Sequence, residues 1–246
     1  MSDASVPALR FRRVAKSFGA VRALDDFTLE VPRGELFGLV GGNGAGKTTL
    51  IKCLLDFLET DGGEIELFGV PHGLTASRRD LAFLPERFNP PFYLTGRDFL
   101  RYMSELHRTP YDESRIAAIF GRLDLDLSAL TRPARTYSKG MTQKLGLAAC
   151  LTSGKALQVL DEPTSGLDPK ARALLKRELR ALREAGATVF LTSHALADVD
   201  EICDRMAVLH GGRLRFAGPP RELMSRHSAN TLEEAFLDCI ATTPSQ

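Results

Sequence analysis

Hydrophobic residues in this chain gather in short continuous runs, and segments with helical spacing separate the runs. The runs at 36–40, 156–160 and 187–192 are mostly apolar and are bounded by turn-forming or charged residues. After the first run, apolar residues recur at helical spacing over 47–58. Strands that are apolar on both faces and alternate with helices are typical of a mainly parallel sheet with covered faces. We therefore expect an α/β fold.

The middle of the chain, from about 87 to 152, has a different pattern. Apolar residues form two helical stripes there, and Thr95 with Asp98 makes a capping box at the start of the first stripe. No segment in this region alternates as a strand does. We expect one domain, 1–246, with a core at 1–86 and 153–246 and a helical subdomain at 87–152.

Shorter elements complete the pattern. Residues 64–68 alternate like a strand, and two strand-like runs flank His210-Gly211-Gly212, which is a hairpin signal. Thr231 and Glu234 begin a last short helix.

Composition narrows the classes of partner and compartment. The 246 residues include 32 basic and 31 acidic side chains, so the chain lacks the excess of basic residues that is typical of nucleic-acid-binding proteins. No window approaches the roughly 20 apolar residues that span a bilayer, and the N-terminus lacks the apolar centre of a secretory signal. The four cysteines are far apart and read as small buried side chains in a reducing compartment. We expect a cytoplasmic protein that does not bind nucleic acid.

A glycine-rich loop follows the first apolar run and precedes a helix, and it fits the pattern G-x-x-x-x-G-K-S/T. Its glycines let backbone N–H groups converge on phosphate oxygens, and the helix start adds a positive dipole end. The lysine supplies a charge for the outer phosphates, and the threonine after it supplies a hydroxyl for Mg²⁺. We predict that a nucleotide binds here, with Mg²⁺, on Gly41, Gly42, Asn43, Gly44, Ala45, Gly46, Lys47, Thr48 and the adjacent Thr49.

Two acids, Asp161 and Glu162, end the strand predicted at 156–160. Ligands of open parallel sheets bind at the carboxyl ends of the strands, where the phosphate loop also lies. Strand alternation sends the two side chains in different directions. We predict Asp161 as the Mg²⁺ carboxylate, acting through water, and Glu162 as the general base. The alternative is a pair of surface acids.

His194 and Asp168 each have an ordinary structural explanation beside a functional one. His194 follows a buried strand, so its imidazole could orient water near the γ-phosphate, or it could be a packed or surface histidine. Asp168 precedes Pro169 and a helical segment, and sequence physics alone favours a helix cap there.

The stretch "TYSKGMTQKLGLA" resembles the Leu-Ser-Gly-Gly-Gln signature of the ATP-binding subunits of ABC transporters. The combination with "LDEPTSGLDP" and a downstream "TSH" is similar to this family over nearly the whole chain. The resemblance implies a P-loop NTPase core with a mainly parallel sheet, an antiparallel β part near the N-terminus and an inserted helical subdomain. It also implies ATP hydrolysis with Mg²⁺.

The same resemblance implies further roles. Two subunits, either identical or different, would pair head to tail around two ATP molecules. Ser138 and the backbone N–H of Gly140 would then meet the γ-phosphate bound to the partner. Phe18 matches the residue that stacks on adenine, although a core phenylalanine is an equal alternative on physical grounds. Asp168 matches a loop that signals between the two sites, and His194 matches the switch histidine.

Some positions depart from the family pattern. Lys139 and Met141 replace a Gly and the Gln of the signature, while the two residues that carry the phosphate contacts remain. Glu86 stands where a Gln contacts the metal and senses the membrane partner, and its carboxylate adds charge beside an anionic ligand. Gly42 stands where Pro is frequent, and we expect little effect from that change.

The sequence shows no membrane-spanning segment, and this bears on what the predicted hydrolysis would drive. Any transport path belongs to another polypeptide, a permease that would hold this chain on the cytoplasmic face of the cell membrane. The stretch "FLPERFNPPFYLTG", 83–96, could form an apolar docking groove or be buried under the helical insert, and the resemblance favours the groove. The "LPE" loop and "NTLEEAFLD" resemble export-type subunits. The alternatives are a soluble ABC-type ATPase that acts on ribosomes or DNA and a nucleotide-gated scaffold with little hydrolysis.

Overall fold

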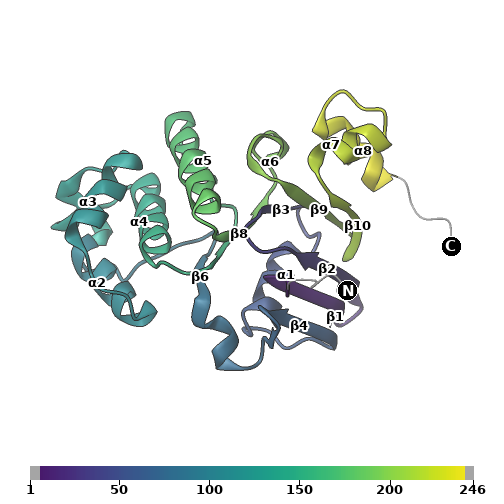
Figure 1. Ribbon diagram of the computed structural model, residues 1–246, viewed down its shortest axis with the longest axis horizontal. Helices are drawn as coiled ribbons and strands as arrows, with labels where there is room; N and C mark the ends of the chain where they lie inside the picture. Colours follow the sequence, from purple (N-terminus) through teal and green to yellow (C-terminus); the bar gives the residue numbers. More distant parts are fainter. Residues whose placement is uncertain (1–5, 242–246) are drawn as a thin grey trace.

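Two β-sheets organise residues 6–241, the part of the chain that the computed structural model describes (Figure 1). The larger sheet has the strand order β10-β9-β3-β8-β7-β6. Its pairs are parallel except for β10, which runs antiparallel to β9 at one edge. This sheet confirms the predicted α/β class. Its strands are β3 (Leu36–Val40), β6 (Leu81–Leu84), β7 (Leu157–Leu160), β8 (Thr188–Ser193), β9 (Arg205–His210) and β10 (Arg213–Gly218).

The smaller sheet is antiparallel, with the order β2-β1-β4-β5, and it confirms the expected β part near the N-terminus. One apolar core joins this sheet to the larger one and includes residues of the first helix, α1. The strands are β1 (Leu9–Phe18), β2 (Val21–Val31), β4 (Gly62–Leu67) and β5 (Val70–Pro71).

The helices divide into groups at different places in the molecule. In Figure 1, α2, α3 and α4 gather at one end of the molecule, and α7 with α8 lies at the opposite end. The stretch that we propose as a helical subdomain contains α2–α4, two 3-10 turns and one isolated bridge. The helices are α1 (Lys47–Leu54), α2 (Gly96–His107), α3 (Glu113–Arg122), α4 (Lys139–Thr152), α5 (Pro169–Glu184), α6 (Leu196–Ile202), α7 (Pro220–Arg226) and α8 (Leu232–Ala241).

The strand that leads into the phosphate loop is buried on both faces. Along β3, Leu36 and Val40 belong to the core under α2–α6, whereas Phe37 and Leu39 belong to the core shared with α1 and the smaller sheet. Successive side chains of a strand point to opposite faces of the sheet, so β3 contributes to an apolar layer on each side. This packing fixes the carboxyl end of β3, where the glycine loop begins.

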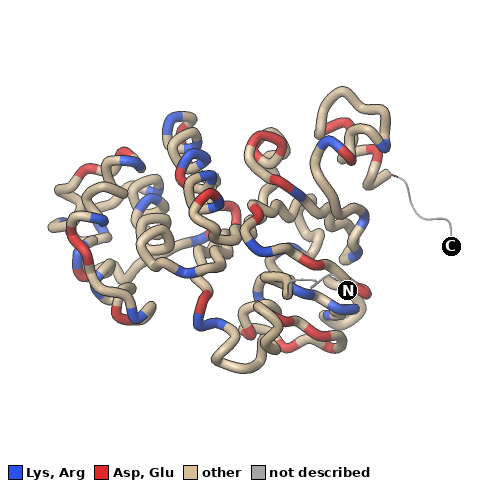
Figure 2. The backbone as a smooth tube through the Cα atoms, in the orientation of Figure 1, with Lys and Arg blue, Asp and Glu red and all other residues tan. Residues whose placement is uncertain are grey.

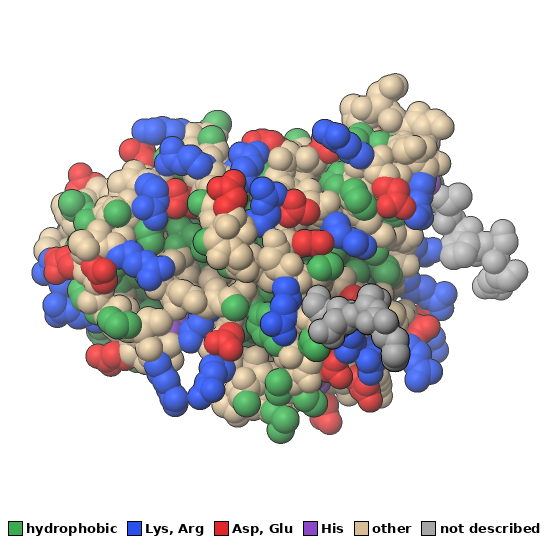
Figure 3. All heavy atoms as spheres, in the orientation of Figure 1, with side chains coloured by type: hydrophobic (Ala, Val, Ile, Leu, Met, Phe, Trp, Pro, Cys, Tyr) green, Lys and Arg blue, Asp and Glu red, His purple; other side chains and the backbone are tan. Residues whose placement is uncertain are grey.

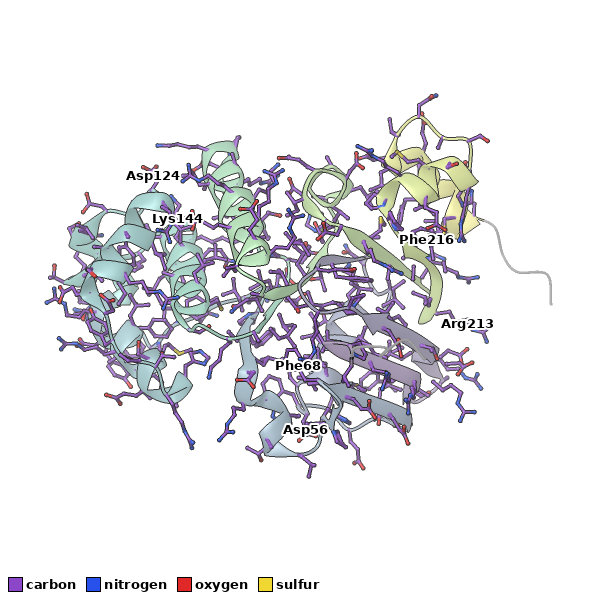
Figure 4. The ribbon with its side chains drawn as sticks, viewed as in Figure 1. Asp56, Phe68, Asp124, Lys144, Arg213 and Phe216 are labelled. Carbon is purple, nitrogen blue, oxygen red and sulfur yellow. The ribbon has the colours of Figure 1, made fainter. Side chains whose placement is uncertain are left out.

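Polar contacts tie the helical end of the molecule to α5. Lys144 of α4 donates to the carbonyl oxygen of Asp124 at 2.9 Å, and the two residues lie side by side in Figure 4. The Asp124 carboxylate in turn accepts from Lys170 of α5 at 2.8 Å. The guanidinium of Arg122 lies 2.7 Å from the carboxylate of Glu178. Helix α5 therefore connects the helical end to the sheet, against which it also packs.

Local contacts and backbone turns explain several of the element boundaries. Thr95 and Asp98 form the predicted capping box at the start of α2. The predicted hairpin is confirmed, since Gly211 and Gly212 have φ values of 56° and 75° between β9 and β10. The prediction of a helix over 47–58 was wrong at its end. Helix α1 ends at Leu54 because Asp56 takes a left-handed backbone, with φ 62°.

Charges are spread over the surface of the described chain. Basic and acidic residues are interspersed along helices and strands in Figure 2, and Figure 3 shows apolar side chains among them on the face in view. Of the helices in residues 6–241, none is both long and apolar enough to cross a membrane.

Candidate active site

A cavity of about 580 Å³ opens above the carboxyl ends of β3, β7 and β8. The position agrees with the rule that ligands of parallel sheets bind beyond the carboxyl ends of the strands. The structure brings together here most of the residues singled out from sequence. The lining comprises Gly42 to Thr49, Glu86, Asp161, Glu162 and His194, together with Val21 and Ala23.

The phosphate loop needs glycine at particular positions. Gly46 has φ 113°, and a Cβ there would lie 2.4 Å from the carbonyl oxygen of Ala23. A Cβ on Gly41 would lie 2.4 Å from the carbonyl oxygen of Leu209. By contrast, a Cβ on Gly42 would meet nothing within 4 Å. The loop is therefore wedged between two strands, with its outer side open to the cavity.

Lys47 lies between the loop and Glu162, which follows strand β7. Its ammonium donates to the carbonyl oxygen of Gly41 at 2.6 Å and lies 3.8 Å from Oε1 of Glu162. The side chain is largely buried, so this charge is held in one place beside the loop. Such a fixed cation is suited to the outer phosphates of a nucleotide.

Asp161 is buried at the end of β7 and accepts a hydrogen bond from the Thr192 hydroxyl at 2.6 Å. Burial raises the pKa of this carboxyl, and the charges of Glu86 and Glu162 raise the pKa further. The hydrogen bond from Thr192 and the charge of Lys47 act in the opposite direction. A divalent cation beside Asp161 would stabilise its ionised form and offset the effect of burial.

Glu162 corrects the sequence argument about alternation. Its backbone has φ 49°, so it is left-handed, and β7 already ends at Leu160. Both acids line the same cavity. Their side chains have different partners because the backbone turns at Glu162, and not, as predicted, because side chains alternate along a strand. Left-handed backbone is uncommon for a residue with a side chain and occurs often at functional sites.

His194 follows β8 and faces Glu162. Its Nδ1 lies 2.8 Å from Oε2 of Glu162, and its backbone N–H donates to the same oxygen at 3.3 Å. The side chain of His194 is 67% exposed, so the residue is not a packed core histidine. The pair presents a carboxylate and an imidazole at the rim of the cavity, where both are within reach of a water molecule.

The donors in the cavity fit Mg²⁺ only when phosphate oxygens complete the shell. Thr48 offers a hydroxyl and Asp161 a carboxylate, and the exposed Glu86 lies on the same lining. Among residues 6–241, no group of three or more His, Cys, Asp or Glu side chains could hold a metal ion. Mg²⁺ is usually held by one or two carboxylates with waters and substrate phosphates. The donor set therefore suits a metal that arrives with a nucleotide.

Five predicted site residues do not line this cavity, namely Gly41 on the inner side of the loop and four residues outside the loop. Ser138 caps α4 by accepting from the N–H of Met141 at 3.2 Å, and Gly140 follows it in the first turn. Asp168 caps α5 by accepting from the N–H of Ala171 at 2.9 Å, which confirms the cap that sequence physics favours. Phe18 is exposed at the end of β1, so the core alternative is wrong for this residue. Their nucleotide contacts stay predictions.

Sequence reasoning missed Thr192, Val21 and Ala23. Thr192 looks like an ordinary buried strand residue, and only the sheet order places its hydroxyl beside the acids of β7. Val21 and Ala23 come from β2, whose approach to the loop depends on how the two sheets pack. No local pattern in the sequence signals such an approach.

A second, apolar cavity of about 500 Å³ adjoins the first. The two cavities share Thr48, Glu86 and Asp161 on their linings. Phe57 and Phe83 meet edge to face in the second cavity, with ring centroids 6.4 Å apart, and Phe57 is 70% exposed. Farther along the same stretch of chain, Phe92 and Tyr93 are also exposed.

The fold and the loop define a class before any comparison is made, namely α/β proteins with a phosphate-binding loop between a parallel strand and a helix. The chain belongs to the ABC transporter family, whose model matches residues 24–165.

Two curated relatives and one solved structure illustrate the family. An uncharacterized ABC transporter ATP-binding protein of Synechocystis is 41% identical over 209 residues, which are 83% of this chain and 58% of the relative. The Nod factor export ATP-binding protein I of Mesorhizobium japonicum is 37% identical over 231 residues, which are 92% of this chain and 67% of that protein. A solved ATP-binding subunit of an ABC transporter is 27% identical, with a TM-score of 0.83 over 94% of this chain and 99% of that one. The chain spans 58% and 63% of the length of the first two curated relatives that it matches.

Proposed function

We propose that this chain binds and hydrolyses ATP as the nucleotide-binding subunit of a membrane transporter. One observation supports hydrolysis above all others, the convergence of Lys47, Glu162 and His194 in one cavity. A protein that only holds a nucleotide needs the loop, but it has no need of a carboxylate paired with an imidazole at the rim.

The chemistry follows from these positions. The glycine loop and Lys47 hold the phosphates, and Glu162 accepts a proton from the water that attacks the γ-phosphate. His194, 2.8 Å from Glu162, orients the carboxylate and that water. Bound Mg²⁺, held by Thr48 and Asp161, with Glu86 on the same lining, would neutralise charge on the β- and γ-phosphates.

The predicted residues outside the cavity are explained by a second subunit. We infer that Ser138 and the N–H of Gly140 contact the γ-phosphate on a partner, at the exposed start of α4. Phe18 would stack on adenine beside Val21, and Asp168 would signal between the two sites while it caps α5. The partner is a second copy of this chain or another ATP-binding subunit.

The apolar cavity is the proposed contact with a permease on the cytoplasmic face of the membrane. The position of the apolar cavity supports this assignment, because Glu86 and Asp161 line both this cavity and the nucleotide cavity. A movement of the permease could therefore be transmitted to the site through these two side chains. Export is the proposed direction, and the name of the Nod factor export relative agrees with it. We expect no nucleic-acid partner.

The Glu162→Gln variant tests hydrolysis directly. We expect ATP affinity near that of the wild type and turnover at least about 100-fold lower, because an amide cannot accept the proton. A matched control is Glu64→Gln, at an exposed side chain of β4 outside the cavity, which should retain normal turnover. Normal turnover by the Glu162 variant would move the general base elsewhere. A wild-type chain that binds ATP without hydrolysing it would favour the scaffold alternative.

The partner is tested by purifying the tagged chain from its native membranes in mild detergent. A multi-spanning membrane protein recovered in equal amount would support the transporter proposal. Recovery with ribosomes or DNA-bound factors would favour the alternative of a soluble ABC-type ATPase.

A further inference from the structure

Thr192 lies where the strand ladder between β7 and β8 stops. The last paired residues are Leu160 and Leu191, so Asp161 and Glu162 lie beyond the ladder. The Asp161 N–H donates to the carbonyl oxygen of Leu84 on the other side, at 2.8 Å. The Glu162 N–H instead donates to the side-chain oxygen of Thr192, at 2.9 Å.

The same hydroxyl makes a second hydrogen bond. It lies 2.6 Å from Oδ1 of Asp161, and Thr192 is completely buried. Because the Glu162 amide can only donate, the hydroxyl must accept there, and its single proton is left for the Asp161 carboxylate. One buried oxygen atom thus contacts the backbone of one acid and the side chain of the other.

We propose that Thr192 is a positioning residue for hydrolysis, which holds the metal carboxylate of Asp161 and the general base Glu162 in a fixed relation. This inference rests on the proposed ATPase function. It assigns Thr192 no contact with nucleotide, because the residue is absent from the lining of the cavity.

Glu162 needs such support for a conformational reason. Its left-handed backbone, with φ 49°, is unfavourable for a residue with a side chain and persists only where the surroundings hold it. The hydrogen bond from its N–H to Thr192 fixes the start of this turn. The turn then places the carboxylate of Glu162 with Oε2 beside His194 and Oε1 near Lys47.

An ordinary packing role for Thr192 predicts a different dependence on chemistry. β-Branched residues are frequent in buried strands because their methyl groups pack well. If packing were the reason for Thr192, valine would replace it well, and serine, which lacks the methyl group, would replace it badly. The positioning role predicts the opposite order.

The test compares Thr192→Val, Thr192→Ser and a control on the same strand. Thr188→Val is that control, since Thr188 is also buried and accepts from a backbone amide, that of Gly34, at 2.9 Å. Thr188 lies at the opposite end of β8, away from the cavity. Three quantities are measured for each variant: the melting temperature, kcat, and the dissociation constant for ATP with Mg²⁺ and with a chelator.

We expect Thr192→Val to lower kcat by about 10- to 100-fold, the usual effect of removing a group that orients a metal ligand. The ratio of the ATP dissociation constants measured with a chelator and with Mg²⁺ should also fall by about 10-fold. This ratio is a binding measurement, so it does not depend on turnover. Thr192→Ser should stay within about 3-fold of wild type in both quantities, because it keeps the hydroxyl. Thr188→Val should lower the melting temperature and leave kcat and the ratio of dissociation constants unchanged.

Two results would overturn the proposal: wild-type values for Thr192→Val, or equal losses for the valine and serine variants. If the valine variant does not fold, Thr192→Ala replaces it in the comparison with serine, because alanine removes the hydroxyl without adding an apolar group. Failure of the proposed function gives a different result. In that case the wild-type chain itself would show no Mg²⁺-dependent ATP hydrolysis.

Discussion

At the scale of single residues, Asp161 combines a proposed role in metal binding with a cost in stability. Its raised pKa means that the folded chain holds the proton more tightly than the unfolded chain does. The favourable contribution is fully present below the ordinary pKa of 3.8 and is lost as the pH rises through the raised value. Near neutral pH, therefore, the ionised carboxylate destabilises the nucleotide-free fold.

Asp161→Asn should separate the two effects. An amide has no charge to desolvate, and its oxygen can still accept the hydrogen bond from Thr192. At about pH 7.5 we expect the nucleotide-free variant to melt higher than wild type, by roughly 2–4 °C for each kcal/mol recovered. The advantage should shrink as the pH falls through the raised pKa of Asp161, because the wild-type carboxyl then becomes protonated.

The same variant should lose most of the extra stabilisation that Mg²⁺ adds to ATP, since an amide is a poor Mg²⁺ ligand. Scanning calorimetry with and without Mg²⁺-ATP measures both changes. A lower melting temperature without nucleotide at about pH 7.5 would contradict the burial argument. An unchanged Mg²⁺ effect would remove Asp161 from the metal site.

At the scale of elements, the phosphate loop predicts a contrast between two of its glycines. Gly46→Ala adds a methyl group 2.4 Å from the carbonyl oxygen of Ala23, at a residue with φ 113°. The loop must shift to relieve this clash, and we expect ATP affinity to fall by at least about 100-fold. Gly42→Ala adds the same methyl group where nothing lies within 4 Å, so affinity should stay within about 3-fold of wild type.

Titration with a fluorescent ATP analogue measures both affinities, and circular dichroism checks that each variant is folded. Equal losses for the two alanine variants would mean that the loop requires flexible glycine in general. Equal tolerance would mean that strand β2, which carries Ala23, does not constrain the loop in solution.

The elements themselves show which features a sequence can predict. Capping at Thr95 and the turn at Gly211 and Gly212 depend on neighbours within four residues, and both were predicted correctly. The end of α1 was misplaced because apolar spacing continues past Asp56, where the backbone turns left-handed. The direction of Glu162 was argued from strand period, but β7 ends before it. Thr192 could not be found, since its role depends on the order of strands in the sheet.

At the scale of the whole molecule, the residues assigned to one reaction lie in separate places. The loop, the acids and His194 line the cavity, whereas Ser138 and Gly140 lie at the start of α4 and do not. If each nucleotide needs both sets, a single chain is incomplete. Two chains placed head to tail would then contain two composite sites, each with a loop from one subunit and a helix start from the other.

Mixing two inactive variants tests this arrangement. Lys47→Ala disables the loop, and Gly140→Asp places a negative charge at the start of α4, where a Cβ meets nothing within 4 Å. Acidic residues are favourable at a helix start, so the second variant should fold while it repels the partner's phosphate. Each variant alone should be nearly inactive. An equal mixture should recover up to about a quarter of the wild-type rate, because half of random dimers are mixed and each has one intact site.

The matched control is an equal mixture of Lys47→Ala with Glu162→Gln. Both changes lie on the cavity side, so every composite site in the mixed dimer carries one of them and no activity should return. The steady rate of phosphate release distinguishes the two mixtures. Recovery in both would mean that subunits do not share sites in the proposed way. Absence of recovery in both, with wild-type chain active, would mean that the start of α4 acts within its own subunit or on something other than ATP.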